Sequence, residues 1–217
     1  MENCLFCKII AGDNITIDKG TQGHGNALIE SKGNVACRFV EWCTIKADGN
    51  IYADSVLNSV LVAKEKIVVS SKYGNVVGGE IYGMRGVIVK EAGNDAGTST
   101  LLRSGLPREE FIRSQELAKL IKEKTAKVDE FSKHLEKFEK LRPEELNARI
   151  VSTKTKIIRS RIVLTSDIKK HSDELTILER RISENSANTF VSVSGTIFEG
   201  ARIYLGSHPY IVNEAIK

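Results

Sequence analysis

Apolar residues recur at a constant interval through the first third of the chain. Ile29, Ile45 and Leu61 are each sixteen positions apart, and two further columns keep the same interval. Those columns are Val35, Ile51 and Ile67, and Cys37, Ala53 and Val69; the preceding copy, with Ile9, Ile15 and Ile17, lies twenty positions earlier. Apolar residues in register at a fixed period indicate a stacked repeat, in which each copy buries its face against the next.

Within each copy, apolar and polar residues alternate, as in the segments 45–47 and 51–53. This period of two, together with many β-branched side chains, predicts short strands over residues 5–91. The interval leaves room for two strands and tight corners in each copy. Residues 1–106 are therefore expected to form a β-helix of parallel strands about 4.8 Å apart. The fifth copy, around residues 76–81, should be slipped by a residue or two.

From Pro107 the apolar period changes to seven. Spacings that alternate between four and three define a seam typical of coiled-coil helices. A second seam begins after Pro143, so residues 107–185 are expected to form a long antiparallel hairpin inserted into the β structure, with a phase slip near Leu164. The apolar seam residues are Leu117, Ile121, Val128, Phe131, Leu135, Phe138, Leu146, Ile157, Leu164, Leu175 and Leu178, and the polar ones are Lys124, Thr153, Ser160 and His171.

Strand patterns return over residues 186–217, which are expected to close onto the β-helix. No run of eighteen apolar residues occurs, so the sequence predicts no membrane-spanning helix. The segment Met1-Glu2-Asn3-Cys4 lacks the layout of a signal peptide, which predicts a cytoplasmic protein with reduced thiols.

The charge of the chain is concentrated in the predicted hairpin. Residues 107–185 hold 19 Lys or Arg and 15 Asp or Glu, whereas the rest holds 13 of each, so the whole net charge of +4 lies in the hairpin. Four basic residues cluster with no acidic residue between Glu145 and Asp167: Lys154, Lys156, Arg159 and Arg161. This cluster is a candidate contact for an acidic protein partner, and nucleic acid is disfavoured because no aromatic stacking residue lies nearby.

The spacing Cys4-x-x-Cys7 is half of a common zinc pattern. The other half would have to come from Cys37 and Cys43, whose spacing does not match. Cys37 also belongs to an apolar column, where a buried thiol packs as a small hydrophobic residue. A structural role is therefore favoured over a metal site, and no cofactor is predicted.

Four stretches resemble a known family when they are taken in their order along the chain. They are residues 47–53, 77–81, 91–98 and 193–203, and together they are similar to the C-terminal region of the flagellar assembly protein A family of bacteria. The resemblance implies a right-handed β-helix with a coiled coil, a cytoplasmic location, and a role in flagellar assembly or its regulation. It implies no enzymatic activity. Family members usually carry a further N-terminal domain, so this chain is expected to be a short member or a fragment.

The expected function is that of a non-enzymatic interaction scaffold, whose hairpin pairs with another protein or with a second copy. Two alternatives stay open. A β-helix that polymerises through its ends would serve as a cytoskeletal element. A β-helix enzyme is less favoured, because the outward residues of the repeats are a mixture of Lys, Glu, Ser and Asn without a clustered site.

Overall fold

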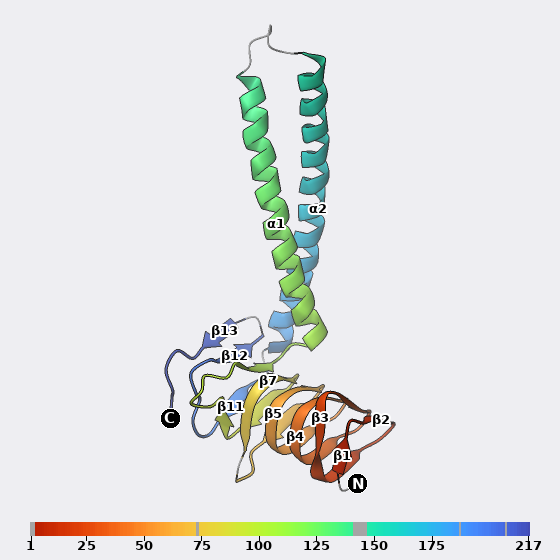
Figure 1. The fold of residues 1–217 in the computed structure, drawn as a ribbon, viewed down its shortest axis with the longest axis vertical. Coiled ribbons are helices and arrows are strands. Elements are labelled where there is room, and N and C mark those ends of the chain that lie inside the picture. Colours follow the sequence, from red (N-terminus) through yellow and green to blue (C-terminus); the bar gives the residue numbers. More distant parts are fainter. Residues whose placement is uncertain (1–2, 73, 141–146, 187, 207) are drawn as a thin grey trace. The chain divides into compact units, whose positions relative to one another are not determined.

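The fold was determined as a computed structural model, which describes residues 3–72, 74–140, 147–186, 188–206 and 208–217. The chain forms two compact units: residues 1–108 together with 181–217, and residues 109–180. The first unit is built from strands and the second from two helices (Figure 1). No described helix is both long enough and apolar enough to cross a membrane.

The first unit is a β-solenoid, in which the strands wind around a common core. Its strands are β1 (Asn3–Leu5), β2 (Lys8–Ala11), β3 (Ile15–Ser31), β4 (Val35–Ala47), β5 (Ile51–Ala63), β6 (Lys66–Val69), β7 (Asn75–Gly83), β8 (Gly86–Val89), β9 (Glu91–Ala92), β10 (Thr100–Ser104), β11 (Val191–Val193), β12 (Ala201–Leu205) and β13 (His208–Ile211). The main path of neighbours is β1-β3-β4-β5-β7-β10-β12-β13. All of these pairs are parallel except the last, β12 with β13. The predicted solenoid is confirmed.

The apolar columns of the sequence are the core of this solenoid. Ile29 pairs with Ile45, Ile45 with Leu61 and Leu61 with Ile81, and all four side chains are fully buried. The column of Ile15, Val35, Ile51 and Ile67 is paired in the same way. Like residues lie on like because parallel strands with the same alternation place equivalent side chains above one another.

The interval between paired residues is less uniform than the sequence suggested. Leu61 pairs with Ile81 after twenty residues, and Ile81 pairs with Leu102 after twenty-one. The predicted slip of the fifth copy is therefore wrong, because that copy is in register once four extra residues between Val69 and Asn75 are allowed for. The prediction of two separate strands per copy also differs from the structure, since β4 and β5 each run without a break for 13 residues.

Each long strand turns a corner at a residue with a left-handed backbone. Trp42 and Asn58 follow the paired residues Glu41 and Leu57 and have φ angles of 51° and 45°, and the equivalent position in β7 is Gly78, at 68°. Left-handed backbone at non-glycine residues is uncommon, and the surrounding ladders hold it in place here. The corner leaves Trp42 45% exposed, so this side chain faces solvent.

A ladder of asparagines joins the turns between successive strands. The backbone N–H and side-chain Nδ2 of Asn34 donate to Oδ1 of Asn14 at 2.6 and 3.1 Å. Asn50 repeats both bonds to Oδ1 of Asn34, at 2.7 and 3.1 Å. These bonds satisfy turn N–H groups that the strand ladders do not reach. In the sequence, Asn14, Asn34 and Asn50 each end a turn, whereas the next turn ends at Lys66, whose backbone N–H donates to Oδ1 of Asn50 at 3.1 Å.

The second unit consists of most of α1 (Arg108–Glu139) and α2 (Ala148–Ser186), about 48 and 58 Å long at 1.5 Å per residue. Glu109 and Glu110 lie in the first turn of α1, where acidic side chains favour the helix dipole. The backbone N–H of Ile150 donates to Oδ1 of Asn147 at 2.9 Å, so Asn147 caps α2. Leu146 of the predicted seam lies outside the described residues.

The other predicted apolar seam residues are all buried or half-buried. The polar seam of α2 differs from the prediction, because Thr153 and Ser160 are exposed while Lys154 and Arg161 are half-buried. With these two residues the least exposed row of α2 keeps spacings of four and three throughout: 150, 154, 157, 161, 164, 168, 171, 175, 178 and 182. The predicted phase slip is therefore wrong.

Candidate functional site

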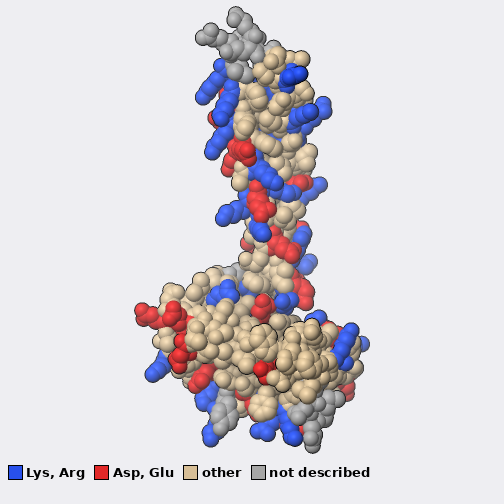
Figure 2. All heavy atoms as spheres, in the orientation of Figure 1, with Lys and Arg blue, Asp and Glu red and all other residues tan. Residues whose placement is uncertain are grey.

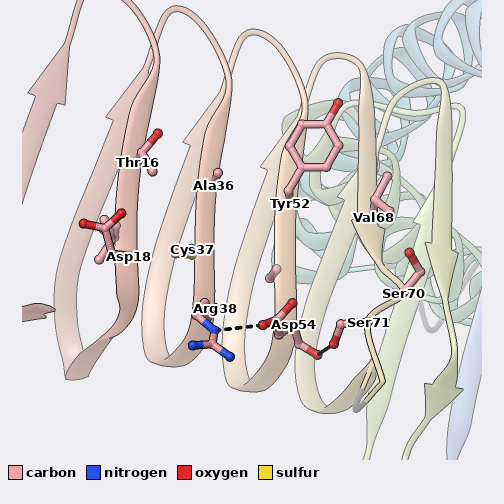
Figure 3. A pocket seen from close by; sticks show the side chains of 12 residues that line it. Thr16, Asp18, Ala36, Cys37, Arg38, Tyr52, Asp54, Val68, Ser70 and Ser71 are labelled. Carbon is pink, nitrogen blue, oxygen red and sulfur yellow. Dashed lines mark hydrogen bonds and ion pairs between the residues drawn. The ribbon is translucent and has the colours of Figure 1, made fainter. Parts of the chain in front are cut away.

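A shallow groove of about 490 Å³ runs across the outer surface of the solenoid, over β3 to β6 (Figure 3). Its floor includes Ile17, Cys37 and Ala53, at the point where the strands bend. Tyr52 stands on one side, and Asp18, Arg38, Asp54 and Ser71 lie on the other (Figure 3). The groove has no signature in the sequence, because Ile17, Cys37 and Ala53 belong to an apolar column and the polar residues beside them form no motif.

The groove shows little of what nucleophilic catalysis requires. Arg38 Nε donates to Asp54 Oδ2 at 3.2 Å, and both side chains are substantially exposed, so this ion pair is weak. Burial, followed by the nearby Cys43 and Asp54, raises the pKa of the Cys37 thiol to about 12. Cys37 is thus a protonated thiol at neutral pH, and only the thiolate is a good nucleophile or metal ligand.

A buried arginine lies between two tyrosines on neighbouring strands. Arg103 of β10 pairs in register with Tyr82 of β7 and with Tyr204 of β12, and its guanidinium lies 4.3 Å from the centroid of the Tyr204 ring. Burial lowers the pKa of Arg103 to about 10, so it stays charged at neutral pH. Tyr82 Oη donates to Glu80 Oε2 at 3.0 Å, and Arg108 Nε donates to the same oxygen at 3.1 Å.

This cluster joins the strands on either side of the helical insertion, since β10 precedes α1 and β12 follows α2. The cluster has no signature in the sequence, because Arg103 and Tyr204 are 101 positions apart and no repeat interval connects them. A cation stacked on an aromatic ring is favourable when it is shielded from water. The cluster therefore has a structural role, since it ties the last rungs together.

Two ion pairs join α1 to α2. Arg113 contacts Glu174 through two hydrogen bonds, Nε to Oε1 at 2.7 Å and Nη2 to Oε2 at 3.0 Å. Further along α1, Lys124 Nζ lies 2.5 Å from Asp167 Oδ2. Because the later residue of α1 pairs with the earlier residue of α2, the helices are antiparallel. Lys124 also lies 3.3 Å from His171 Nε2, which brings together two of the predicted polar seam residues.

Acid should weaken this helix pairing. The hydrogen bond from Lys124 lowers the pKa of the Asp167 carboxyl, and the hydrogen bond from Arg113 lowers the pKa of Glu174, from ordinary values of 3.8 and 4.5. A carboxyl whose pKa is lowered by folding stabilises the fold above its unfolded pKa, and that stability is lost as the pH falls through the folded pKa. We expect the melting temperature, followed by the helical circular dichroism, to be constant above about pH 5 and to fall as the pH drops below about 4.5.

The control for this titration is the double variant Asp167→Asn, Glu174→Gln. Its melting temperature should be lower than that of the wild type at neutral pH and should decrease less on acidification. An equal loss in the wild type and in the double variant would show that other carboxyls cause the acid effect.

The predicted basic cluster is divided between two faces of α2. Lys154 and Arg161 are half-buried, whereas Lys156 and Arg159 are exposed. Figure 2 shows Lys and Arg side chains gathered mainly near the helix ends that adjoin residues 141–146. Of the four candidate residues, Lys156 and Arg159 are thus the ones that α2 presents most openly to a partner.

The cysteines differ from the expectation that all four are reduced. Cys7 is disulfide-bonded, whereas Cys37 and Cys43 are free and buried. Of Cys4, the structure describes only the backbone. Within the described residues, no three His, Cys, Asp or Glu side chains are grouped to hold a metal ion. The zinc hypothesis for Cys4 and Cys7 stays untested, and in the disulfide form Cys7 has no thiolate to offer a metal.

The comparison with protein families decides what kind of solenoid this is. The model of the Flagellar Assembly Protein A beta solenoid domain matches residues 5–217. The chain belongs to the flagellar assembly protein A family. The match extends over both helices as well as the strands, so the insertion is part of the matched region of the flagellar assembly protein A solenoid domain. Searches of curated proteins and of solved structures found no match.

Proposed function

We propose that this chain is a non-enzymatic scaffold of the bacterial cytoplasm that acts in flagellar assembly or its regulation through protein contacts of its helices. Membership of the flagellar assembly protein A family supports the flagellar role. The observation that supports protein contacts is the exposed surface of α2. Its exposed apolar side chains are Val151, Ile162, Val163 and Ile177, which are 52–61% exposed.

The helices are proposed to pair as a coiled coil. Both helices have a least exposed row with spacings of four and three, and interhelical ion pairs join Arg113 to Glu174 and Lys124 to Asp167. A polar layer such as Lys124–Asp167–His171 costs stability in a coiled coil but favours one register over others. With the register set in this way, the same side chains of α2 always face outward.

The outward face of α2 combines basic and apolar side chains. Lys156 and Arg159 are exposed close to Ile162 and Val163. Exposed apolar groups next to charges of one sign are typical of protein interaction surfaces. The complementary partner is a protein that presents acidic residues beside an apolar patch.

The test is a pull-down from a lysate of flagellated bacteria with the tagged chain. The double variant Lys156→Glu, Arg159→Glu should recover a flagellar partner at least about tenfold less well than the wild type, because like charges would then face each other. The matched control is Lys64→Glu in the solenoid, whose side chain is 71% exposed, and it should recover the partner at the wild-type level.

Both variants should melt like the wild type, because the charges that they change are exposed. The ion pair of Lys64 with Asp48, which the control removes, also lies at the surface and contributes little to stability. Equal recovery of the partner by the wild type, the double variant and the control would show that this face of α2 does not bind the partner. Loss of recovery in the Lys64 variant alone would assign the contact to the solenoid.

A further inference from the structure

A second row of side chains runs along α2, beside its least exposed row. This outer row consists of Val151, Thr155, Ile158, Ile162 and Thr165, which are spaced by four and three residues and are all β-branched. Each member follows a member of the least exposed row by one position, which turns it by about 100° around the helix. Val151 and Ile162 are 52% and 61% exposed. Both threonines are exposed as well, and Ile158 is half-buried.

The two threonines of the outer row use their hydroxyl protons within the helix. Oγ1 of Thr155 donates to the carbonyl oxygen of Val151, and Oγ1 of Thr165 donates to the carbonyl oxygen of Arg161, both at 2.9 Å. Another chain can cover such hydroxyls without leaving a donor unpaired. The outer row is therefore suited to burial along its whole length, although two of its five members are polar.

The spacing of the outer row is that of a helix-binding seam. Intervals of four and three keep side chains in line with a facing helix, and β-branched residues pack well between two paired helices. The other helix of the hairpin has no such second row. Of the large apolar side chains of α1, all of which the structure describes, only Ile112 is exposed, at 36%. The outer row is thus a face of α2 that α1 leaves open.

The charges beside the outer row are basic. Lys154, Arg159 and Arg161 each adjoin a member of the row, and no acidic residue occurs between Glu145 and Asp167. Residues that flank an apolar seam form ion pairs with the facing helix in coiled coils. A second copy that presented the same row would bring like charges together, which is unfavourable. The complementary occupant is a helix with acidic residues beside its own apolar row.

A membrane surface fits this face of α2 less well than a helix does. Helices that lie on membranes carry Trp, Phe or Leu on a wide apolar face. α2 contains no Phe, Tyr or Trp, and its outer row is a narrow line of Val, Ile and Thr. Short side chains in a narrow line suit the interlocked packing of paired helices.

We propose that the outer row binds an acidic amphipathic helix of the protein partner, so that α2 pairs with α1 on one side and with the partner on another. The proposal rests on the proposed function, since it takes the partner to be a protein that binds the exposed face of α2. It adds that the contacting segment of the partner is helical, with apolar residues spaced by four and three and with Asp or Glu beside them.

The probe for this test is a synthetic peptide of about three heptads, with Ile and Leu in its apolar row and Glu on both sides of that row. Repulsion between the Glu residues keeps the peptide from pairing with itself. Fluorescence anisotropy measures its binding to the full chain, and circular dichroism measures its helix content. The wild type should bind the peptide and raise its helicity.

Two variants of the chain test the row and the charges beside it. Ile162→Gln should raise the dissociation constant at least about tenfold, because a polar amide would then be buried within the row. Arg159→Gln should raise it about threefold at low salt and should have no effect at about 1 M salt, where exposed ion pairs are screened. A peptide with Lys in place of Glu should bind at least about tenfold more weakly.

The matched control is Ile177→Gln, which makes the same change on the same helix. Ile177 is 56% exposed and lies outside the outer row. This variant should bind the peptide within about twofold of the wild type. All three variants change exposed side chains and should melt like the wild type.

Four results would overturn the proposal. One is an equal loss of peptide binding in Ile162→Gln and Ile177→Gln, and another is binding without a gain of helix. Adsorption of the wild type to vesicles of phosphatidylserine and phosphatidylcholine, lost in Ile162→Gln, would assign the row to a membrane surface. A mass of two chains in sedimentation, reduced to one by Ile162→Gln, would assign it to a second copy.

The pull-down from flagellated bacteria distinguishes failure of this proposal from failure of the proposed function. If Lys156→Glu, Arg159→Glu loses the partner while Ile162→Gln and Ile177→Gln recover it equally, the proposed function stands and the helical contact is overturned. If the peptide binds through the outer row but the wild type and the double variant recover the same proteins equally, the row binds helices and the proposed function is overturned.

Discussion

Gly79→Ala should lower the free energy of unfolding of the solenoid by about 4 kcal/mol, a value at the upper end for single substitutions. Gly79 follows the corner of β7 and has a φ of 80°, a conformation that L side chains rarely adopt. A methyl group there would lie 2.1 Å from the carbonyl oxygen and 2.6 Å from the amide nitrogen of Ser59. Both contacts are with backbone of the adjacent rung, so relief requires β5 and β7 to separate.

The matched control for this substitution is Gly25→Ala. Gly25 has a similar φ of 87°, but no atom lies within 4 Å of the position that a methyl group would take. Its substitution should therefore cost only the backbone strain, about 1 kcal/mol. Urea unfolding followed by circular dichroism measures both. Equal losses in the two variants would mean that the close stacking of the corners contributes nothing to stability.

Ile45→Ala should lower the free energy of unfolding by about 3 kcal/mol. Ile45 lies in the middle of the central column, between Ile29 and Leu61, and is fully buried. Truncation removes apolar contacts and leaves a cavity, and the neighbouring rungs cannot collapse into it because their hydrogen bonds set the spacing between strands. The loss should appear as a lower midpoint of urea unfolding with an unchanged slope.

Ile162→Ala provides the comparison, since it removes the same atoms from a side chain that is 61% exposed. This variant should change the free energy of unfolding by no more than about 0.5 kcal/mol. If Ile45→Ala were equally mild, the apolar columns would not be the core that holds the rungs together.

Substitutions of buried column residues and of exposed apolar residues are expected to change different properties of the protein. The columns are buried and paired on both sides, so substitutions there act on stability. The exposed apolar residues Ile162 and Val163 of α2 contribute little to the fold of the chain, and substitutions there are expected to act on binding of the proposed protein partner. Stability and binding measurements on the same variants can therefore be interpreted separately.

The column residues and the two long helices could be predicted from the sequence. These features depend on local alternation and on short fixed intervals, which are set by the geometry of strands and helices. Thus Val35, Ile51 and Ile67 could be aligned correctly before any coordinates were known. The four-and-three spacing of α1 predicted its least exposed row for the same reason.

Contacts between distant or irregular segments could not be predicted in this way. The twenty- and twenty-one-residue steps after β5 come from corners that hold extra residues, and no local period records such insertions. Arg103 meets Tyr204 because the chain returns to the sheet after two helices, and Lys154 and Arg161 are half-buried in a row with Ile157. Pairing between strands and the choice of a helix face depend on long-range packing, which a period along the chain does not contain.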